Sequence, residues 1–202
     1  TDFTINFSPS VDELEITVDT ALASVDEDNE AEVTLSGLQM VDTDGSETLS
    51  LVFVEISSST SSKVSSFSIN GEEITSTSGV FDGSHFTYTD SDGLEQQLSE
   101  VDGISGITDG SSSALLHAGT IVNVFVAPPS VAQADTASIV LSANHHYAGA
   151  IKFVFLYTIT DVSTSSSGNQ RDTFANANSF TTSFGAVVDF PAELGNEITD
   201  GE

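Results

Sequence analysis

Every second residue from Ile151 to Ile159 is a large apolar or aromatic side chain. A period of two is the period of a β-strand, so this run predicts a strand with one wholly apolar face. Val154 and Leu156 occupy positions on the opposite face of the same run. We therefore expect residues 151–159 to form a central strand that is covered on both sides.

The same alternation recurs along the chain between turn residues. Asn70-Gly71 follows one such segment and is a strong signal for a β-hairpin. About ten short strands separated by turns favour a β-sandwich over a sheet of alternating strands and helices. The other strands are expected near residues 3–7, 14–18, 33–35, 49–53, 67–69, 121–126, 139–141 and 180–187.

One short helix is expected over Gly93–Val101 in this otherwise all-β chain. Leu94, Leu98 and Val101 recur there at helical spacing, and Asp92 would cap the first turn. Pro128-Pro129 is expected in a connection between strands, because proline cannot continue a central strand.

The length of 202 residues allows one large domain. We expect a single β-sandwich over residues 1–190, with an insertion at about 57–133, and an acidic linker to a next domain over 191–202. The sequence begins with Thr1 rather than Met and shows no signal sequence, so we expect a monomeric module of a longer chain.

Acidic side chains outnumber Lys and Arg by 31 to 3, which gives a formal net charge of −28. This charge excludes nucleic acid as a partner and disfavours docking on an anionic membrane. No apolar run is long enough for membrane insertion, and the absence of Cys excludes disulfides and zinc–thiolate sites. The acidic groups must therefore be screened by salt or neutralised by divalent cations.

The strongest carboxylate cluster is Asp42-Thr43-Asp44-Gly45-Ser46-Glu47, a tight turn followed by a strand. Ca²⁺ prefers six to eight hard oxygens, and this turn supplies three carboxylates and backbone carbonyls. An EF-hand is excluded because Phe53 stands where that loop needs Glu. The missing ligands are expected from Asp26-Glu27-Asp28, one strand earlier; the alternative is a solvated acidic surface.

A second candidate Ca²⁺ cluster combines Asp90 and Asp92 with Glu100 and Asp102 beyond the expected helix. The alternative is an Asp-rich turn with a helix cap at Asp92. Glu55 is isolated from both clusters and is expected to be exposed on its strand.

Catalytic patterns are weak in this sequence. It contains His85, His117, His145 and His146, but no nucleophile-elbow motif and no zinc-protease motif. We therefore expect a protein that is not an enzyme. A secreted hydrolase with a carboxylate pair stays open as an alternative, because no pair is singled out.

Two segments resemble the Ig-like modules of giant RTX-type bacterial adhesins. The first runs from Val25-Asp26-Glu27-Asp28 through Asp42-Thr43-Asp44-Gly45-Ser46-Glu47-Thr48-Leu49, and the second is Tyr147-Ala148-Gly149-Ala150-Ile151 with the strand ending at Asp161. The resemblance implies an Ig/cadherin-like sandwich at the bacterial cell surface, exported by type I secretion and rigidified by Ca²⁺. It implies as metal ligands Asp26, Glu27, Asp28, Asp42, Asp44 and Glu47, and adds Asp161.

The stretch from Ser57 to Gln133 is longer than a spacer module needs. By analogy with the peptide-binding modules of such adhesins, we expect a Ca²⁺-dependent site for peptide C-termini, with the ion binding the carboxylate. Lys63 is expected in a loose loop and Lys152 on a covered face, so neither meets that carboxylate. A structural extender and a module for surface glycans are alternatives; a pocket lined by residues 80–115 would favour binding. The ligand-binding residues are expected in the turn near Thr108–Ser113 and beside it: Asp102, Asp109, Ser111 and Ser112.

Overall fold

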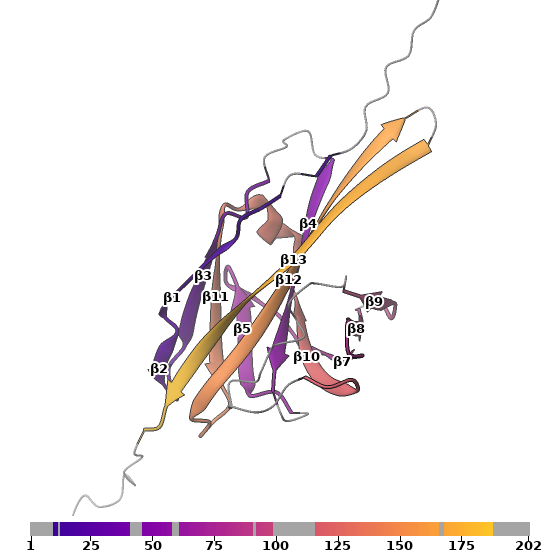
Figure 1. Cartoon of the computed structure of the whole chain (residues 1–202). Coiled ribbons are helices and arrows are strands. Elements are labelled where there is room, and N and C mark those ends of the chain that lie inside the picture. The colour runs from indigo at the N-terminus through magenta and orange to yellow at the C-terminus, as the bar shows by residue number, and fades with distance from the viewer. Residues whose placement is uncertain are drawn as a thin grey trace, which may run out of the picture.

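The computed structural model describes residues 10–11, 13–40, 46–57, 61–90, 92–98, 116–165 and 168–187. At residues 22, 132–133, 163–165 and 168–172 it describes the backbone alone. Two β-sheets pack face to face as a sandwich, which confirms the all-β fold class (Figure 1).

The smaller sheet, sheet A, has five strands in the order β1-β3-β11-β5-β6. All of its neighbouring strands are antiparallel. Its strands are β1 (Thr17–Leu22), β3 (Ala31–Ser36), β11 (Thr136–Ala143), β5 (Val64–Ile69) and β6 (Glu72–Glu73).

The larger sheet, sheet B, has eight strands in the order β2-β13-β12-β4-β10-β7-β8-β9. Only the contact between β2 and β13 is parallel. Its strands are β2 (Ser24–Asp26), β13 (Gly168–Gly185), β12 (Gly149–Ser165), β4 (Glu47–Ile56), β10 (Thr120–Val126), β7 (Thr77–Phe81), β8 (Phe86–Thr89) and β9 (Glu95–Gln97).

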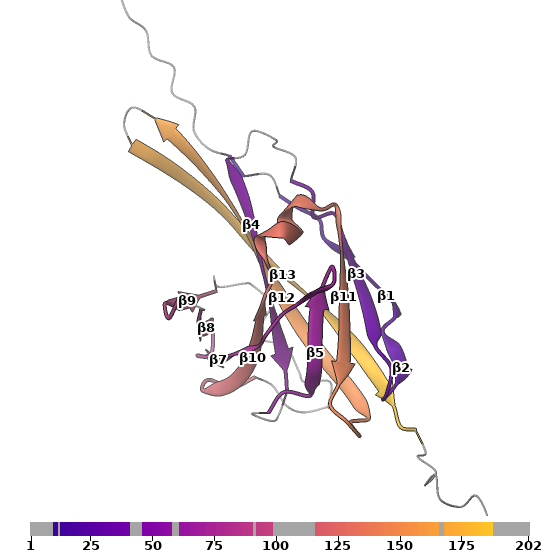
Figure 2. The same ribbon diagram turned by 180° about the vertical axis from the view of Figure 1, so that it is seen from behind.

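The long hairpin of β12 and β13 is the longest feature of the molecule. The two strands stay in register from the pair Gly149 and Phe184 to the pair Ser165 and Gly168. One end of the hairpin extends beyond the rest of the sandwich, as both ribbon views show (Figures 1 and 2). β4 pairs along β12 as far as Asp161, opposite Glu47.

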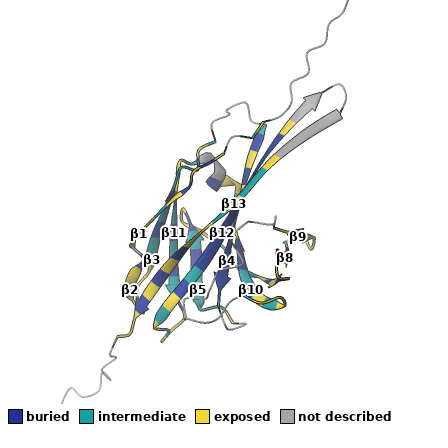
Figure 3. Ribbon diagram, viewed as in Figure 1, coloured by how far each residue is buried: buried dark blue, intermediate teal, exposed yellow. Residues whose placement is uncertain are grey.

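The central core fills the space between the sheets, where β12 and β4 are the most buried strands (Figure 3). Its centre is a cluster of phenylalanine rings. Phe67 stacks on Phe125 with centroids 4.6 Å apart, and Phe153 stacks on Phe180 at 5.2 Å. Aromatic contacts at these separations stabilise a core beyond the area they bury.

A second core, the outer core, lies on the other face of sheet B. Val54, Val124, Val154 and other residues of β4, β10 and β12 pack there against Phe86 and neighbours from β7 and β8. The central position expected for residues 151–159, covered on both faces, is therefore confirmed. The expected insertion at 57–133 supplies the described strands β5 to β10 and the 3-10 helix η2 (Pro129–Gln133).

The Asn70-Gly71 hairpin is confirmed between β5 and β6, and both residues have positive φ angles, 53° and 82°. The helix expected over Gly93–Val101 is wrong where that segment is described. Glu95–Gln97 forms β9 and pairs with β8 instead. Leu94 is 61% exposed, so the apolar repeat was not one face of a packed helix.

Among the described residues, no helix is long and apolar enough to cross a membrane. Pro128 and Pro129 lie between β10 and β11, at the start of η2, which confirms the expected connection.

Candidate functional site

Two buried carboxylates face each other at one end of sheet B. Glu47 begins β4 and Asp161 lies opposite it on β12, and each residue is 6% exposed. Directly opposed residues of antiparallel strands have Cβ atoms about 5 Å apart, so the two side chains are neighbours. In β4, alternation puts Glu47 on the face that carries Leu49, Leu51 and Phe53 into the central core.

Asp161 is only partly satisfied by hydrogen bonds. Its Oδ2 accepts from the backbone N–H of Ser10 at 3.0 Å, whereas its buried Oδ1 accepts none. No described lysine lies beside it, because Lys152 pairs with Ile56 at the other end of β4. A buried carboxylate oxygen next to a second carboxylate attracts a cation, because charge buried without a partner is costly. This chemistry fits a hard divalent cation such as Ca²⁺.

The acidic residues expected to complete this site stand shortly before Glu47 in the sequence. Asp42 and Asp44 lie outside the described residues, as does the rest of 41–45. Backbone pairing places Asp172 of β13 in the same row, opposite Asp161. Within the described part of the chain, no three acidic or histidine side chains come together as a metal-binding group.

Asp26, Glu27 and Asp28 lie at the other end of the sheet. Asp26 pairs with Gly185 and Gly149 with Phe184, whereas Glu47 pairs with Asp161. At about 3.3 Å per residue along β12, the two ends are roughly 40 Å apart. The expectation that Asp26-Glu27-Asp28 shares an ion with the Glu47 turn is therefore wrong.

Glu27 fixes the path of the chain after β13. It is 8% exposed, its Oε1 accepts from Val187 N–H at 3.0 Å, and its own N–H donates to Gly185 O at 2.8 Å. Asp26 and Asp28 are exposed beside it.

Asp90 organises the turn between β8 and β9. Its Oδ1 accepts from the N–H groups of Asp92 and Leu94 at 3.0 and 2.9 Å, and its Oδ2 accepts from Gln96 at 2.7 Å. These bonds, with that from Leu94 first, lower the pKa of the Asp90 carboxyl. The geometry is that of an Asp-rich turn, capped by Asp90 rather than by Asp92. The other expected ligands of this cluster, Glu100 and Asp102, lie outside the described residues.

The expected ligand-binding residues Asp102, Asp109, Ser111 and Ser112 also lie outside the described residues. The structure has a pocket of about 450 Å³ that is lined by residues 72–77, 88–90, 126 and 128. It meets the expected 80–115 lining only at Tyr88, Thr89 and Asp90.

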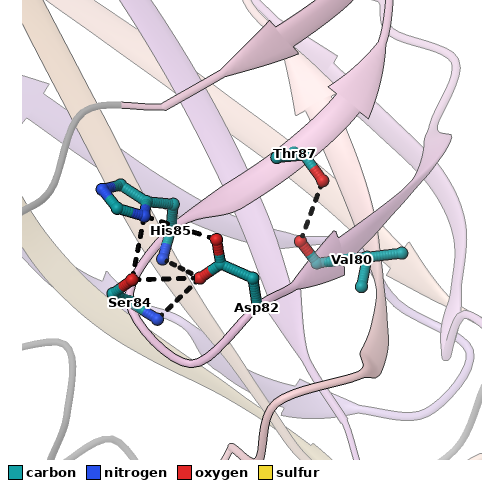
Figure 4. Close-up of polar contacts among 5 residues, drawn as sticks. All are labelled: Val80, Asp82, Ser84, His85 and Thr87. Atoms are coloured by element: carbon teal, nitrogen blue, oxygen red, sulfur yellow. Dashed lines mark hydrogen bonds and ion pairs between the residues drawn. The ribbon is translucent and has the colours of Figure 1, made fainter.

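Ser84 and His85 bring a hydroxyl and an imidazole into contact beside Asp82 (Figure 4). Ser84 Oγ lies 2.9 Å from His85 Nδ1, and Asp82 Oδ2 lies 3.4 Å from the same nitrogen. A catalytic triad needs the serine and the carboxylate on opposite ring nitrogens. Asp82 also accepts from the N–H groups of Ser84 and His85, which lowers its pKa to about 2, so this is a turn between β7 and β8.

The burial of Glu55 was not predicted from the sequence. It was expected to be exposed, but it is 0% exposed. Its carboxylate accepts from Ser62 Oγ and Lys63 N–H, both at 2.7 Å, and from Asn123 Nδ2 at 3.3 Å. Burial raises the pKa of Glu55 despite these bonds.

The loose loop expected around Lys63 is wrong, because Lys63 N–H donates to the buried Glu55 carboxylate. Its carbonyl accepts from Asn144 N–H at 2.8 Å, and its Nζ lies 5.7 Å from the ring centre of Tyr147. His145 and His146 are in the turn that precedes Tyr147, with ring centroids 3.7 Å apart. Ser62 and Lys63, in the described part of the Ser57–Ser66 segment, are thus held by hydrogen bonds to β4 of sheet B and to Asn144, the residue after β11 of sheet A.

No protein-family model matches this sequence, and no curated protein matches it significantly. Among solved structures, the chain is similar to AvmM, described in the words "AvmM Catalyzes Macrocyclization in Alchivemycin A Biosynthesis". The similarity covers 90% of this chain and 92% of that one, at 14% sequence identity and a TM-score of 0.35. A likeness this distant carries no argument about function.

Proposed function

We propose that this protein is a Ca²⁺-dependent ligand-binding module of an extracellular bacterial adhesin, without enzymatic activity. Its ligand is a peptide on a host or neighbouring cell, held in part through its C-terminal carboxylate. The observation that supports Ca²⁺ most directly is the buried Asp161, whose Oδ1 lacks a hydrogen-bond donor while the Glu47 carboxylate lies opposite. On this proposal, the acidic segment Asp42-Thr43-Asp44-Gly45-Ser46, which directly precedes Glu47 in the sequence, supplies the further oxygens.

The path of the chain supports a module in a tandem array. Ser10 binds Asp161 at one end of sheet B, and Val187 binds Glu27 at the other. A module whose two described chain ends lie roughly 40 Å apart extends a fibre with little loss of length. Acidic residues at both ends provide ligands for ions that stiffen the array.

The second candidate function is a structural extender with no ligand of its own. The path of the chain favours an extender as much as a ligand-binding module. An extender does not require the outer core or the pocket beside β8, however. A glycan ligand in place of a peptide remains a variant of the first function, since Ca²⁺ also binds vicinal hydroxyls.

The experiment compares thermal unfolding of the wild type and Asp161→Asn, in EDTA and in millimolar Ca²⁺. Because Asn removes one of two buried like charges, we expect Asp161→Asn to be more stable than the wild type in EDTA. In Ca²⁺ the order should reverse, because the variant has lost a ligand. At a hundredfold excess over Kd the ion adds about 2.7 kcal/mol, a rise in Tm of roughly 5–10 °C.

Glu95→Gln is the control, since Glu95 is exposed on β9, which four other strands of sheet B separate from β12. It should leave the response to Ca²⁺ unchanged. Melting curves of the wild type that coincide in EDTA and Ca²⁺ would refute the metal site.

A further inference from the structure

The described pocket of about 450 Å³ lies where the chain crosses from sheet A to sheet B. One wall is β6 together with residues 74–76, which lead from β6 into β7. Residues 88–90 at the end of β8, together with Val126 and Pro128, supply the rest of the described lining. Its volume falls within the range of small-ligand sites in proteins.

Tyr88 is the buried polar side chain of this pocket. The residue is 8% exposed and packs in the outer core. Within the described part of the chain, its hydroxyl makes no hydrogen bond. Burial, and then the charge of Asp90, raise the pKa of Tyr88, so the hydroxyl stays neutral. The hydroxyl is not one of the fully buried polar atoms without a partner, so it retains accessible surface.

The rim of the pocket is acidic. Glu72 and Glu73 are exposed lining residues, and neither carboxylate has a hydrogen-bond donor or cationic partner among the described residues. The described lining of the pocket contains no Lys or Arg. Asp90 adds a third carboxylate, although its oxygens are already engaged in the turn between β8 and β9. The pocket thus combines an aromatic and aliphatic floor with negative charge at the mouth.

Among the described strands, β6 has no partner on its outer edge, and it lines the pocket. It is the last strand of sheet A and pairs only with β5. An open edge of this kind accepts an extended peptide as an additional strand. The residues that follow, Thr75 and Ser76, are exposed and continue the same wall.

We propose that this pocket binds the side chain of an arginine or lysine in an extended peptide that pairs with the chain along Glu72–Ser76. The inference deepens the proposed function, on which it rests, by naming the residue class that the peptide must contain. A guanidinium or ammonium group carries only donors, which matches the Tyr88 hydroxyl and the Glu72 and Glu73 carboxylates as acceptors. The apolar stem of the side chain lies against Val126 and Pro128.

Charge favours the same ligand. The net charge of −28 attracts a basic peptide and repels an acidic one at a distance. At contact, a cation over the Tyr88 ring would gain a further attraction. Among the described lining residues, an acidic side chain would meet three carboxylates and no cation.

The test uses immobilised heptapeptides, randomised except for a central Arg, citrulline or Glu, in millimolar Ca²⁺. Citrulline keeps the shape of Arg without its charge. We expect the Arg set to retain the protein and the other two sets to lose it, with affinities about tenfold apart. Failure of every Arg peptide to bind would overturn the proposal.

The variant Glu72→Gln/Glu73→Gln should lower the affinity of the selected peptide by about tenfold. Its control, Glu30→Gln/Asp135→Asn, removes the same charge from exposed positions outside the pocket and should bind as the wild type. Equal losses in both variants would show general electrostatic attraction and overturn the site. Tyr88→Phe should weaken binding severalfold through the hydroxyl alone.

Agmatine, a free guanidinium compound, separates a peptide from a small cation as the ligand. We expect it to compete only at far higher concentration than the peptide, because it cannot pair with β6. Equal competition would overturn the peptide part of the proposal. Ca²⁺-dependent melting is measured on the same samples, so loss of peptide binding is distinguishable from loss of the metal site.

Discussion

Glu55 ties together three parts of the chain from a position with no exposed surface. Ser62 and Lys63 bind it from the connection to β5, and Asn123 binds it from β10. We expect Glu55→Ala to lower the free energy of unfolding by about 3–5 kcal/mol, because these donors lose their buried partner. Urea unfolding measures this loss.

Glu55→Gln is the informative comparison for that loss. Glutamine keeps an acceptor for Lys63 N–H and removes the buried charge, so its cost should be about 1 kcal/mol. Glu30→Gln, at an exposed position, should change stability by less than about 0.5 kcal/mol. If Glu55→Ala and Glu30→Gln have the same small effect, Glu55 is not a structural hub.

The raised pKa of Glu55 predicts how its contribution depends on pH. The folded protein holds this proton more tightly than the unfolded chain, in which the pKa of Glu55 is near the ordinary value of 4.5. Stability from this group is therefore present at low pH and falls as pH rises from 4.5 through the folded pKa. Subtracting the Glu55→Gln profile from that of the wild type should isolate this fall; a difference that is flat with pH would contradict it.

At the scale of elements, Gly79 allows β7 to lie close to β8 and the outer core. A Cβ at Gly79 would lie 2.7 Å from Val124 Cγ2 and 2.9 Å from the carbonyl oxygen of Thr87. We expect Gly79→Ala to cost about 1–3 kcal/mol, because β7 must move away from both neighbours. Ser78→Ala, at the exposed neighbouring position, should be nearly neutral. Equal melting temperatures for the two variants would show that the close approach is not required.

The free edge of β13 is protected by its own side chains. Asn176 Oδ1 accepts from Ala177 N–H and Asn178 Oδ1 from Ser179 N–H, both at 2.7 Å. Edge N–H groups that are occupied in this way cannot pair with another chain. Asn178 Nδ2 also reaches Ile16 O at 3.4 Å, next to a polar groove of about 570 Å³.

We therefore expect Asn176→Val/Asn178→Val to self-associate when salt screens the net charge. Light scattering in high salt measures this association. Thr181→Val is the control, since it raises β propensity at an exposed position without freeing an edge N–H. Association of the control to the same degree would point to hydrophobicity rather than to the edge.

The alternation that predicted β12 and β4 also contained the information that was missed. Glu47 and Glu55 keep the period of Leu49, Leu51 and Phe53, so both belong to the inward face of β4. An acid in phase with an apolar face is buried, and the expectation of an exposed Glu55 ignored that phase. The same rule would have singled out Asp161, in phase with Ile159 on β12.

Other elements could not be predicted from local pattern. β13 carries Asn, Ala and Thr at many of its positions, so its length is set by pairing with β12 rather than by its own propensity. The position of β7 to β9 in sheet B depends on the pairing of β7 with β10, two strands that are distant in sequence. The pocket beside β6 joins residues 72–77 to Val126 and Pro128, and no sequence signal brings these together.

At the scale of the whole molecule, charge and burial oppose each other. The net charge of −28 favours expansion, while the two cores favour compaction. Most of the acidic side chains are spread along the whole chain, whereas Glu47 and Asp161 form one buried pair. Repulsion among the distributed charges is screened by any salt, whereas a buried carboxylate pair is stabilised by a cation whose size and coordination fit it.

Titrations at equal ionic strength should separate these two effects. In EDTA, NaCl should raise the Tm of the wild type and of Asp161→Asn by the same amount, because screening acts on the whole surface. Ca²⁺ should then raise the wild type further, and Mg²⁺ should do so less, because a smaller ion demands a stricter octahedral site. If Ca²⁺, Mg²⁺ and NaCl at equal ionic strength give the same Tm, the stabilisation is screening alone and the carboxylate pair binds no specific ion.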